Sequence, residues 1–149
     1  MSSDDAARRV TLTRTGRLTF RATNALGATI DLGPGGDAAE FSPVDLLLAA
    51  IAGCTAMDVD AITAKRAEAE EFDLVSSGQK VRDGDGNHLV DLTVDFSVRF
   101  PEGEAGDAAR GVLQTAIRRS HDRLCTVSRT VELTSPIAVT LEGAELEEG

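Results

Sequence analysis

The longest apolar stretch of the chain lies at residues 46–57, where Leu, Ala and Ile dominate and polar side chains are almost absent. A helix start signal precedes it: Ser42 can act as N-cap, Pro43 suits the first helical position, and Asp45 completes an S-x-x-D pattern similar to a capping box. We therefore predict one long helix over residues 42–65. Because a helix that is apolar all round leaves no face for water, this helix should be buried on all sides.

Alternation of apolar and polar positions predicts strands on both sides of this helix. The expected strands lie in residues 9–23, divided by a bend at Thr15 and Gly16, and in residues 28–32, 72–82, 88–100 and 137–142. In the clearest strand, residues 88–100, apolar side chains recur at every second position. Such a strand has one face on a core and one in water, so we expect an antiparallel hairpin closed by the DGDGN turn at residues 83–87.

A second helix is predicted after residues 101–106, which break the last strand of the hairpin. Asp107 is placed to cap this helix, an apolar stripe runs along it, and Cys125 lies at or just past its end. Residues 126–133 fit a further short helix. Residues 33–40 form a glycine-containing loop, but the loop lacks the spacing that a phosphate-binding loop requires.

Strands that cluster between helices indicate the α+β class. The length fits a single domain over residues 1–149, with flexible tails expected at residues 1–8 and 143–149. A net charge of −10 and the absence of Trp and Tyr argue against nucleic acid as a partner. The N-terminus lacks the apolar region of a secretory signal, and the apolar run is too short and too soon followed by acids to span a bilayer. We therefore expect a cytoplasmic protein.

The chain has two cysteines, Cys54 and Cys125, and in a reducing compartment these are expected to be thiols. Either can be a small buried hydrophobic residue, the commonest fate of a free cysteine. Their positions also suit a peroxidatic and resolving pair, because Cys54 follows Gly53 on the central helix and Cys125 lies where a thiol can move. Zinc is a weaker alternative: His121 and Cys125 could share a helix face, but Cys54 and His88 are isolated in sequence.

Two motifs taken together resemble a known family. The segment SPVDLLLAAIAGCTAMDV and the later segment LCTVSRTV are similar to those of the OsmC/Ohr family, the osmotically inducible and organic-hydroperoxide-resistance proteins. The resemblance covers nearly the whole chain and implies the OsmC-like fold, with antiparallel sheets around a long central helix in an intertwined homodimer. It also implies the reduction of organic hydroperoxides without a bound cofactor or metal, and recycling by an external dithiol such as a lipoylated protein.

Carried over by position, the resemblance makes Cys54 the peroxidatic thiol, Cys125 the resolving thiol, and Arg17 the arginine that stabilises the thiolate. Val44 stands where the active peroxidases have a glutamate, and Asp58 lies one helical turn after Cys54, where an anion disfavours a thiolate. The leading hypothesis is a thiol-dependent peroxidase for organic hydroperoxides in oxidative stress defence. The alternative is a catalytically weak dimer that binds a small apolar ligand or senses redox state.

Overall fold

The computed structural model describes residues 7–36 and 40–148, and it confirms the α+β class. The elements are β1 (Val10–Gly16), β2 (Thr19–Asn24), β3 (Thr29–Leu32), α2 (Pro43–Thr63), β4 (Glu71–Asp83), β5 (Gly86–Arg99), α3 (Glu104–Arg119), the π-helical turn η1 (Ser120–Leu124), α4 (Thr126–Glu132), β6 (Thr140–Leu141) and β7 (Ala144–Glu145). The chain divides into two compact units: the first comprises Met1–Ala52 and Val75–Asp95, the second Gly53–Leu74 and Phe96–Gly149. Helix α2 and strands β4 and β5 each continue from one unit into the other.

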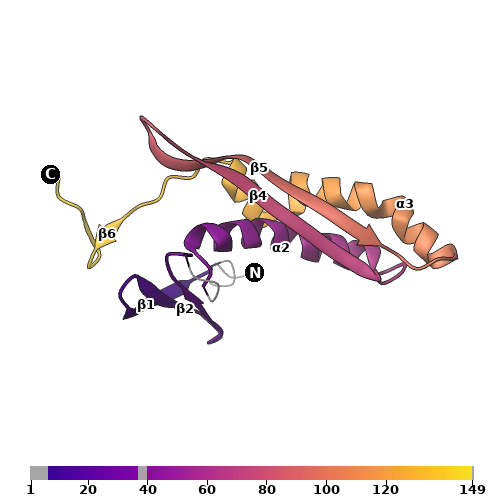
Figure 1. Cartoon of the computed structure of the whole chain (residues 1–149), viewed down its shortest axis with the longest axis horizontal. Coiled ribbons are helices and arrows are strands. Elements are labelled where there is room, and N and C mark those ends of the chain that lie inside the picture. Colours follow the sequence, from indigo (N-terminus) through magenta and orange to yellow (C-terminus); the bar gives the residue numbers. More distant parts are fainter. Residues whose placement is uncertain (1–6, 37–39, 149) are drawn as a thin grey trace. The chain divides into compact units, whose positions relative to one another are not determined.

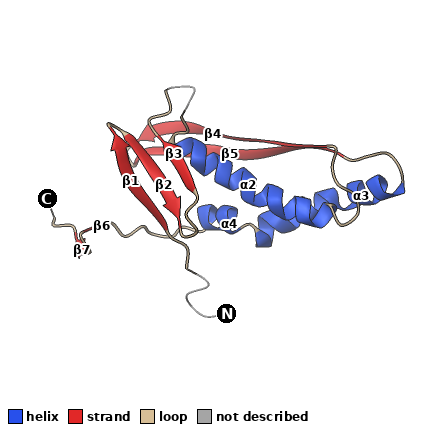
Figure 2. Ribbon diagram, turned by 90° about the horizontal axis from the view of Figure 1, so that it is seen from below, coloured by secondary structure: helices blue, strands red, loops and turns tan. Residues whose placement is uncertain are grey.

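Strands β1, β2 and β3 form an antiparallel sheet in that order (Figure 2). The predicted strand–turn–strand pattern is confirmed, but the turn lies at Arg17 and Leu18, just after the expected bend. Leu18 has a φ of 61°, a left-handed backbone conformation that few residues other than glycine adopt. The next turn is built by Asn24, whose side-chain oxygen accepts the N–H groups of Leu26 and Ala28.

Helix α2 starts as the sequence predicts. The Ser42 hydroxyl accepts the N–H of Asp45 at 3.1 Å, and the Asp45 carboxylate accepts the N–H of Ser42 at 2.8 Å. This reciprocal pair is a capping box with aspartate at its far end, and it satisfies donors that a helix start leaves unpaired. The backbone hydrogen bond from Ser42, and after it the side-chain one, lower the pKa of Asp45.

The expectation that α2 is buried on all sides is wrong for the single chain. Val44 and Leu47 are each 39 % exposed and Met57 is 75 % exposed, whereas Ile51 and Val59 are buried. One chain of this size supplies too few elements to surround a helix that is apolar all round. With 21 residues and a mean hydropathy of 1.6, α2 is long and apolar enough to cross a membrane, a test that the central helix of a soluble domain also passes.

Strands β4 and β5 form the predicted hairpin and lie side by side (Figure 1). Its turn lies at Gly84 and Asp85, where Asp83 Oδ1 accepts the N–H of Asp85 at 2.9 Å. Gly86 follows with a φ of 102°, a conformation that glycine adopts without strain. Exposed and half-buried residues alternate along most of β4. The period-two pattern therefore reflects a ribbon with one sheltered face, and the DGDGN segment is a hairpin turn.

Helix α3 begins at Glu104, before the predicted cap at Asp107, so that prediction is wrong. The N-cap is Gly103, with a φ of 111° and no side-chain hydrogen bond to the helix. Asp107 lies in the first turn instead. Close packing accounts for the earlier start, since Gly106 is buried directly against the carbonyl group of Pro101. That contact depends on how the chain folds back before the helix, which no local sequence signal records.

The structure of the C-terminal region agrees only in part with the prediction from the sequence. Helix α4 confirms the short helix expected over residues 126–133. The strand expected over residues 137–142 is wrong in extent, because β structure there is confined to Thr140–Leu141, paired with Ala144–Glu145. Ile137 is 89 % exposed, so the apolar side chain at the start of the expected strand is not packed against a core in the described part of the chain. Residues 1–6 and 149 of the predicted tails lie outside the described residues, as do residues 37–39 of the predicted loop.

Candidate active site

Both cysteines lie in the second compact unit, on elements far apart in the sequence. Cys54 belongs to the part of α2 in this unit, and Cys125 lies between η1 and α4. Both are free thiols, and they lie close enough for each to influence the ionisation of the other. The structure therefore brings together the two thiols that the sequence singled out.

Cys125 is wholly buried and its sulfur caps the start of α4. The sulfur accepts the N–H of Ser128 at 3.3 Å and lies 3.2 Å from the Ser128 hydroxyl oxygen, and the Thr55 side chain is also hydrogen-bonded to it. Burial by itself raises the pKa of Cys125. The hydrogen bonds with Ser128, Thr55 and Cys54 together outweigh burial and hold this pKa below that of an ordinary thiol.

Cys54 is partly exposed, and the influences that raise its pKa outweigh those that lower it. Burial is the main cause that raises the pKa of its thiol; a hydrogen bond with the Val127 backbone opposes it, and Cys125 and Asp58 raise it further. The pKa of Cys54 therefore lies above that of an ordinary thiol, in the direction expected from Asp58. A Cβ added at Gly53 would meet no atom of the described chain within 4 Å, so the space beside the residue that precedes Cys54 is open.

Asp58 is fixed by a contact that the sequence did not indicate. The Ser120 hydroxyl donates to Asp58 Oδ2 at 2.8 Å, and the Ser120 carbonyl accepts the N–H of Cys125 at 2.8 Å. Ser120 is wholly buried in η1. Sequence reasoning missed Ser120 because its partner lies 62 positions away. Ser128 could have been found, since it stands three residues after Cys125, at the spacing of an N-cap side chain and the N–H that it accepts.

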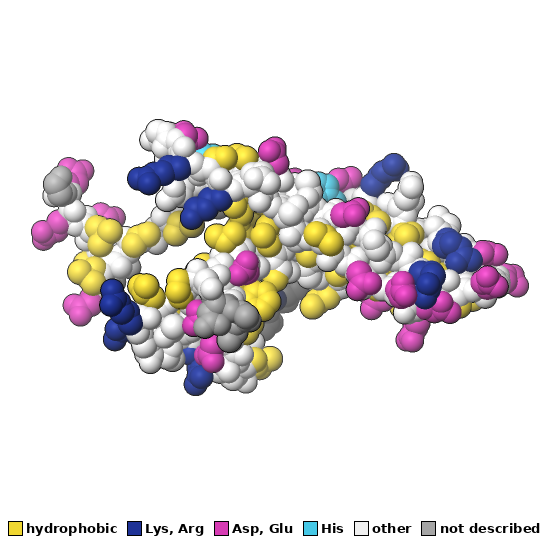
Figure 3. All heavy atoms as spheres, in the orientation of Figure 1, with side chains coloured by type: hydrophobic (Ala, Val, Ile, Leu, Met, Phe, Trp, Pro, Cys, Tyr) yellow, Lys and Arg dark blue, Asp and Glu magenta, His cyan; other side chains and the backbone are white. Residues whose placement is uncertain are grey.

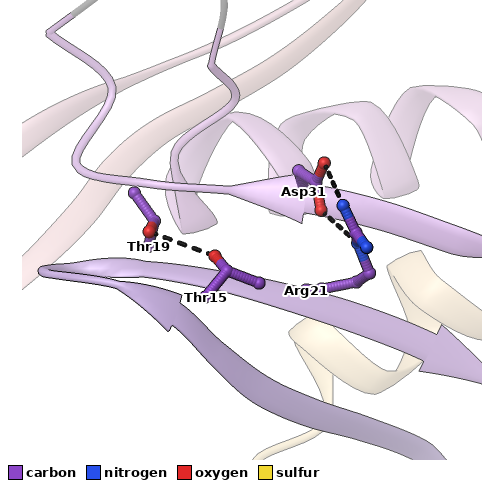
Figure 4. Close-up of polar contacts among 4 residues, drawn as sticks. All are labelled: Thr15, Thr19, Arg21 and Asp31. Carbon is purple, nitrogen blue, oxygen red and sulfur yellow. Dashed lines mark hydrogen bonds and ion pairs between the residues drawn. The ribbon is translucent and has the colours of Figure 1, made fainter.

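The arginines near the first turn lie in the first unit. Arg17, the predicted thiolate helper, is exposed in the turn between β1 and β2. Its neighbour Arg21 points from β2 towards Asp31 of β3 and makes two hydrogen bonds to the carboxylate, at 2.7 and 3.1 Å (Figure 4). The same view shows the hydroxyls of Thr15 and Thr19 in contact at 3.1 Å. Arg21 is therefore engaged with Asp31, and the role of Arg17 towards Cys54 stays a prediction.

The described ranges, residues 7–36 and 40–148, contain no group of three or more His, Cys, Asp and Glu side chains that could hold a metal. His121 is exposed and lies 3.1 Å from Glu132, and His88 lies 3.7 Å from Asp83. Neither histidine joins a cluster with the two thiols in that part of the chain. The zinc hypothesis therefore finds no donor set among the described residues.

The structure is that of an α+β protein with two neighbouring free thiols, and comparison with known proteins identifies its family. The profile of the OsmC-like proteins matches residues 35–142. The chain therefore belongs to the OsmC-like family, and the resemblance drawn from the two motifs is confirmed. No curated protein matches the chain.

Among solved structures, the chain is similar to an OsmC-like protein of unknown function from Vibrio cholerae O1 biovar eltor, with 15 % identity, 85 % of this chain and 94 % of that chain covered, and a TM-score of 0.69. It is also similar to an OsmC-like protein from Mycoplasma pneumoniae, with 17 % identity, coverages of 85 % and 87 %, and a TM-score of 0.65. An organic hydroperoxide resistance protein from Elizabethkingia anophelis matches with 16 % identity, coverages of 83 % and 87 %, and a TM-score of 0.53. Identities this low show a shared fold.

Proposed function

We propose that this protein is a thiol-dependent peroxidase that reduces organic hydroperoxides to alcohols through Cys54 and Cys125. The proximity of the two thiols, each of which influences the ionisation of the other, carries the proposal. A partly exposed thiol beside a buried one suits a pair in which substrate oxidises the first and the second resolves it. Similar structures from Elizabethkingia anophelis and Legionella pneumophila bear the name of organic hydroperoxide resistance proteins, which supports the same substrate class.

The chemistry balances in three steps. The Cys54 thiolate attacks the distal peroxide oxygen, which bears the hydrogen, and the O–O bond breaks. The alkoxide takes up the proton that the thiol released and leaves as the alcohol. Cys54 is then a sulfenic acid, and the Cys125 thiol condenses with it to form a disulfide and water. An external dithiol, such as a lipoylated protein, reduces the disulfide by thiol–disulfide exchange. One dithiol is therefore consumed for each hydroperoxide reduced.

The proposed enzyme is an intertwined homodimer in the reducing cytoplasm. Hydrophobic side chains remain uncovered on the surface of the single chain (Figure 3). Met57 and Val75 are 75 % and 65 % exposed, a degree of exposure typical of an interaction surface when many such residues occur together. A second copy of the chain would cover α2, whose burial one chain leaves incomplete. Arg17, from the same or the partner chain, is proposed to stabilise the Cys54 thiolate.

Oxidation of the purified, reduced protein by cumene hydroperoxide and by hydrogen peroxide tests this proposal. We expect loss of both thiols and a mass decrease of about 2 Da, faster with the organic peroxide. Cys54→Ser should abolish the reaction, whereas Cys125→Ser should stop at a sulfenic acid that dimedone traps. Arg17→Ala should slow the first step, with Arg14→Ala as its matched control. Thiols that stay reduced for minutes in millimolar peroxide would refute the proposed peroxidase activity.

A second candidate is a ligand-binding protein with weak thiol chemistry. Burial and the nearby Asp58 raise the pKa of Cys54, which lowers the fraction of reactive thiolate at neutral pH. The second unit also has an open cavity of about 450 Å³ with a mixed lining, apolar from Ala56, Met57, Ala64, Ala69 and Phe72 and acidic from Asp60 and Glu68. This candidate predicts no peroxide-dependent turnover with any dithiol, together with saturable binding of an apolar dye such as Nile red.

A further inference from the structure

Ser120 joins the surroundings of the two cysteines. Its hydroxyl donates to Asp58 Oδ2 at 2.8 Å, and its carbonyl accepts the N–H of Cys125 at 2.8 Å. Ser120 is wholly buried, and its hydrogen bond to Asp58 is partly sheltered from water. Asp58 lies one turn after Cys54 on the same face of α2, since residues four apart on a helix are neighbours. One buried residue therefore holds the Asp58 carboxylate through its hydroxyl and the backbone of Cys125 through its carbonyl.

The two sulfurs have different surroundings. Cys125 is surrounded by hydrogen-bonding groups: the Ser128 N–H at 3.3 Å, the Ser128 hydroxyl at 3.2 Å and the Thr55 side chain. Cys54 has one backbone donor, at Val127, and the carboxylate of Asp58 nearby. Hydrogen-bond donors favour an anion, whereas a neighbouring carboxylate opposes one. When the pair has lost a single proton, the negative charge is therefore favoured on Cys125.

We propose that Asp58 is a positioning residue that keeps the proton of the singly ionised thiol pair on Cys54 and directs the negative charge to Cys125. Among the residues that the structure describes, the titratable groups that act on Cys54 are Asp58 from α2 and Cys125 from the junction of η1 and α4. The inference rests on the proposed function in taking this pair as the reactive centre. The position of the proton is a property of the resting protein, however, and its measurement needs no peroxide.

The consequence for the chemistry is that the Cys54 thiol of the resting protein reacts slowly. Cys54 attacks a peroxide only as the thiolate, so a carboxylate that keeps the proton on Cys54 lowers its reactivity at neutral pH. Release of the Ser120–Asp58 hydrogen bond would free the carboxylate to move away from Cys54. Asp58 then adds to burial in raising the pH at which the partly exposed Cys54 becomes reactive, while the buried Cys125 holds the charge.

The first test follows each thiol separately. Because the chain has two cysteines, ¹³Cβ labelling of cysteine gives two NMR signals, which Cys54→Ser and Cys125→Ser assign. In the wild-type protein we expect the Cys125 signal to titrate at lower pH than the Cys54 signal, with each curve showing the coupling between the sites. Titration in the reverse order, or of both signals together at the pH of free cysteine, would overturn the proposal.

The second test changes the charge alone. Asp58→Asn removes the negative charge and keeps an oxygen that can accept the Ser120 hydroxyl, and Asp60→Asn is the matched control on the same helix. In the Cys125→Ser background at neutral pH, Asp58→Asn should raise the rate of Cys54 alkylation by iodoacetamide about three- to tenfold, because charges about 6 Å apart interact by a corresponding energy. Asp60→Asn should change it by less than about twofold, since charges farther apart interact more weakly. Equal rates in the two variants would overturn the proposal.

The outcomes separate this inference from the peroxidase proposal. If the titration order and the effect of Asp58→Asn hold but no peroxide is consumed, the inference stands and the proposed function fails. If peroxide is consumed but Cys54 ionises first, the function stands and the inference fails. Circular dichroism establishes that Asp58→Asn is folded, and if it is not, the titration order of the wild-type protein decides.

Discussion

Two glycines of α3 allow a test of how closely this helix packs at its start. Gly106 is buried, and an added Cβ would overlap the carbonyl oxygen of Pro101 and lie 2.8 Å from its carbonyl carbon. The obstacle is backbone, so no side chain can rotate to make room. Gly111 is exposed on the same helix, and a Cβ there would meet no described atom within 4 Å. The same substitution therefore has opposite consequences at the two positions.

Alanine within a helix is favoured over glycine by roughly 0.5–1 kcal/mol, because glycine loses more backbone entropy on folding. Gly111→Ala should therefore raise the free energy of unfolding by roughly 0.5–1 kcal/mol. At Gly106 the overlap with Pro101 adds a penalty of about 1–3 kcal/mol, nearer the upper end because backbone must shift. Gly106→Ala should therefore lose about 2 kcal/mol, or about 4–8 °C in Tm for a chain of this size.

Urea unfolding followed by circular dichroism measures both variants, since the chain lacks Trp and Tyr for fluorescence. All samples need the same protein concentration, because association changes apparent stability. The expected result is a difference of about 3 kcal/mol between the two alanine variants, with opposite signs relative to the wild-type protein. If Gly106→Ala were as stable as Gly111→Ala, the close contact between α3 and Pro101 would not exist, and the explanation given for the start of α3 would be wrong.

Three further predictions concern the start of α2 and the thiols. Ser42→Ala should lower the free energy of unfolding by about 1 kcal/mol, because the N–H of Asp45 loses its acceptor; thermal unfolding measures this loss. The pKa of Asp45 is lowered by its hydrogen bonds to Ser42, so its contribution to stability is present above its unfolded pKa and is lost as pH falls through the lower folded value. Asp45→Asn should thus be less stable than the wild-type protein near neutral pH and equal to it in acid, and a constant difference in Tm at all pH values would contradict this. Ser128→Ala removes a side-chain hydrogen bond that lowers the pKa of Cys125, so its ¹³Cβ signal should titrate at higher pH, whereas Thr130→Ala should leave it unchanged.

Much of the fold could be predicted because its signals are local. The capping box of Ser42 and Asp45 involves residues three apart, and the hairpin depends on alternation and on a turn that glycine permits. The start of α3 could not be predicted, because the packing of Gly106 on Pro101 outweighs the capping preference of Asp107. The strand expected at residues 137–142 forms only at Thr140–Leu141, because alternation predicts a strand only where a core exists to receive it.

The sequence by itself determined which thiols are present, which elements carry them, and the family to which their motifs belong. Only the tertiary structure decided that Cys54 and Cys125 lie close together and that their pKa values are shifted in opposite directions. The contact of Ser120 with Asp58 joins residues 62 positions apart, and no local pattern encodes such a pairing. The ionisation of a thiol depends on burial and on the donors and charges that folding places around it, so it belongs to the three-dimensional arrangement.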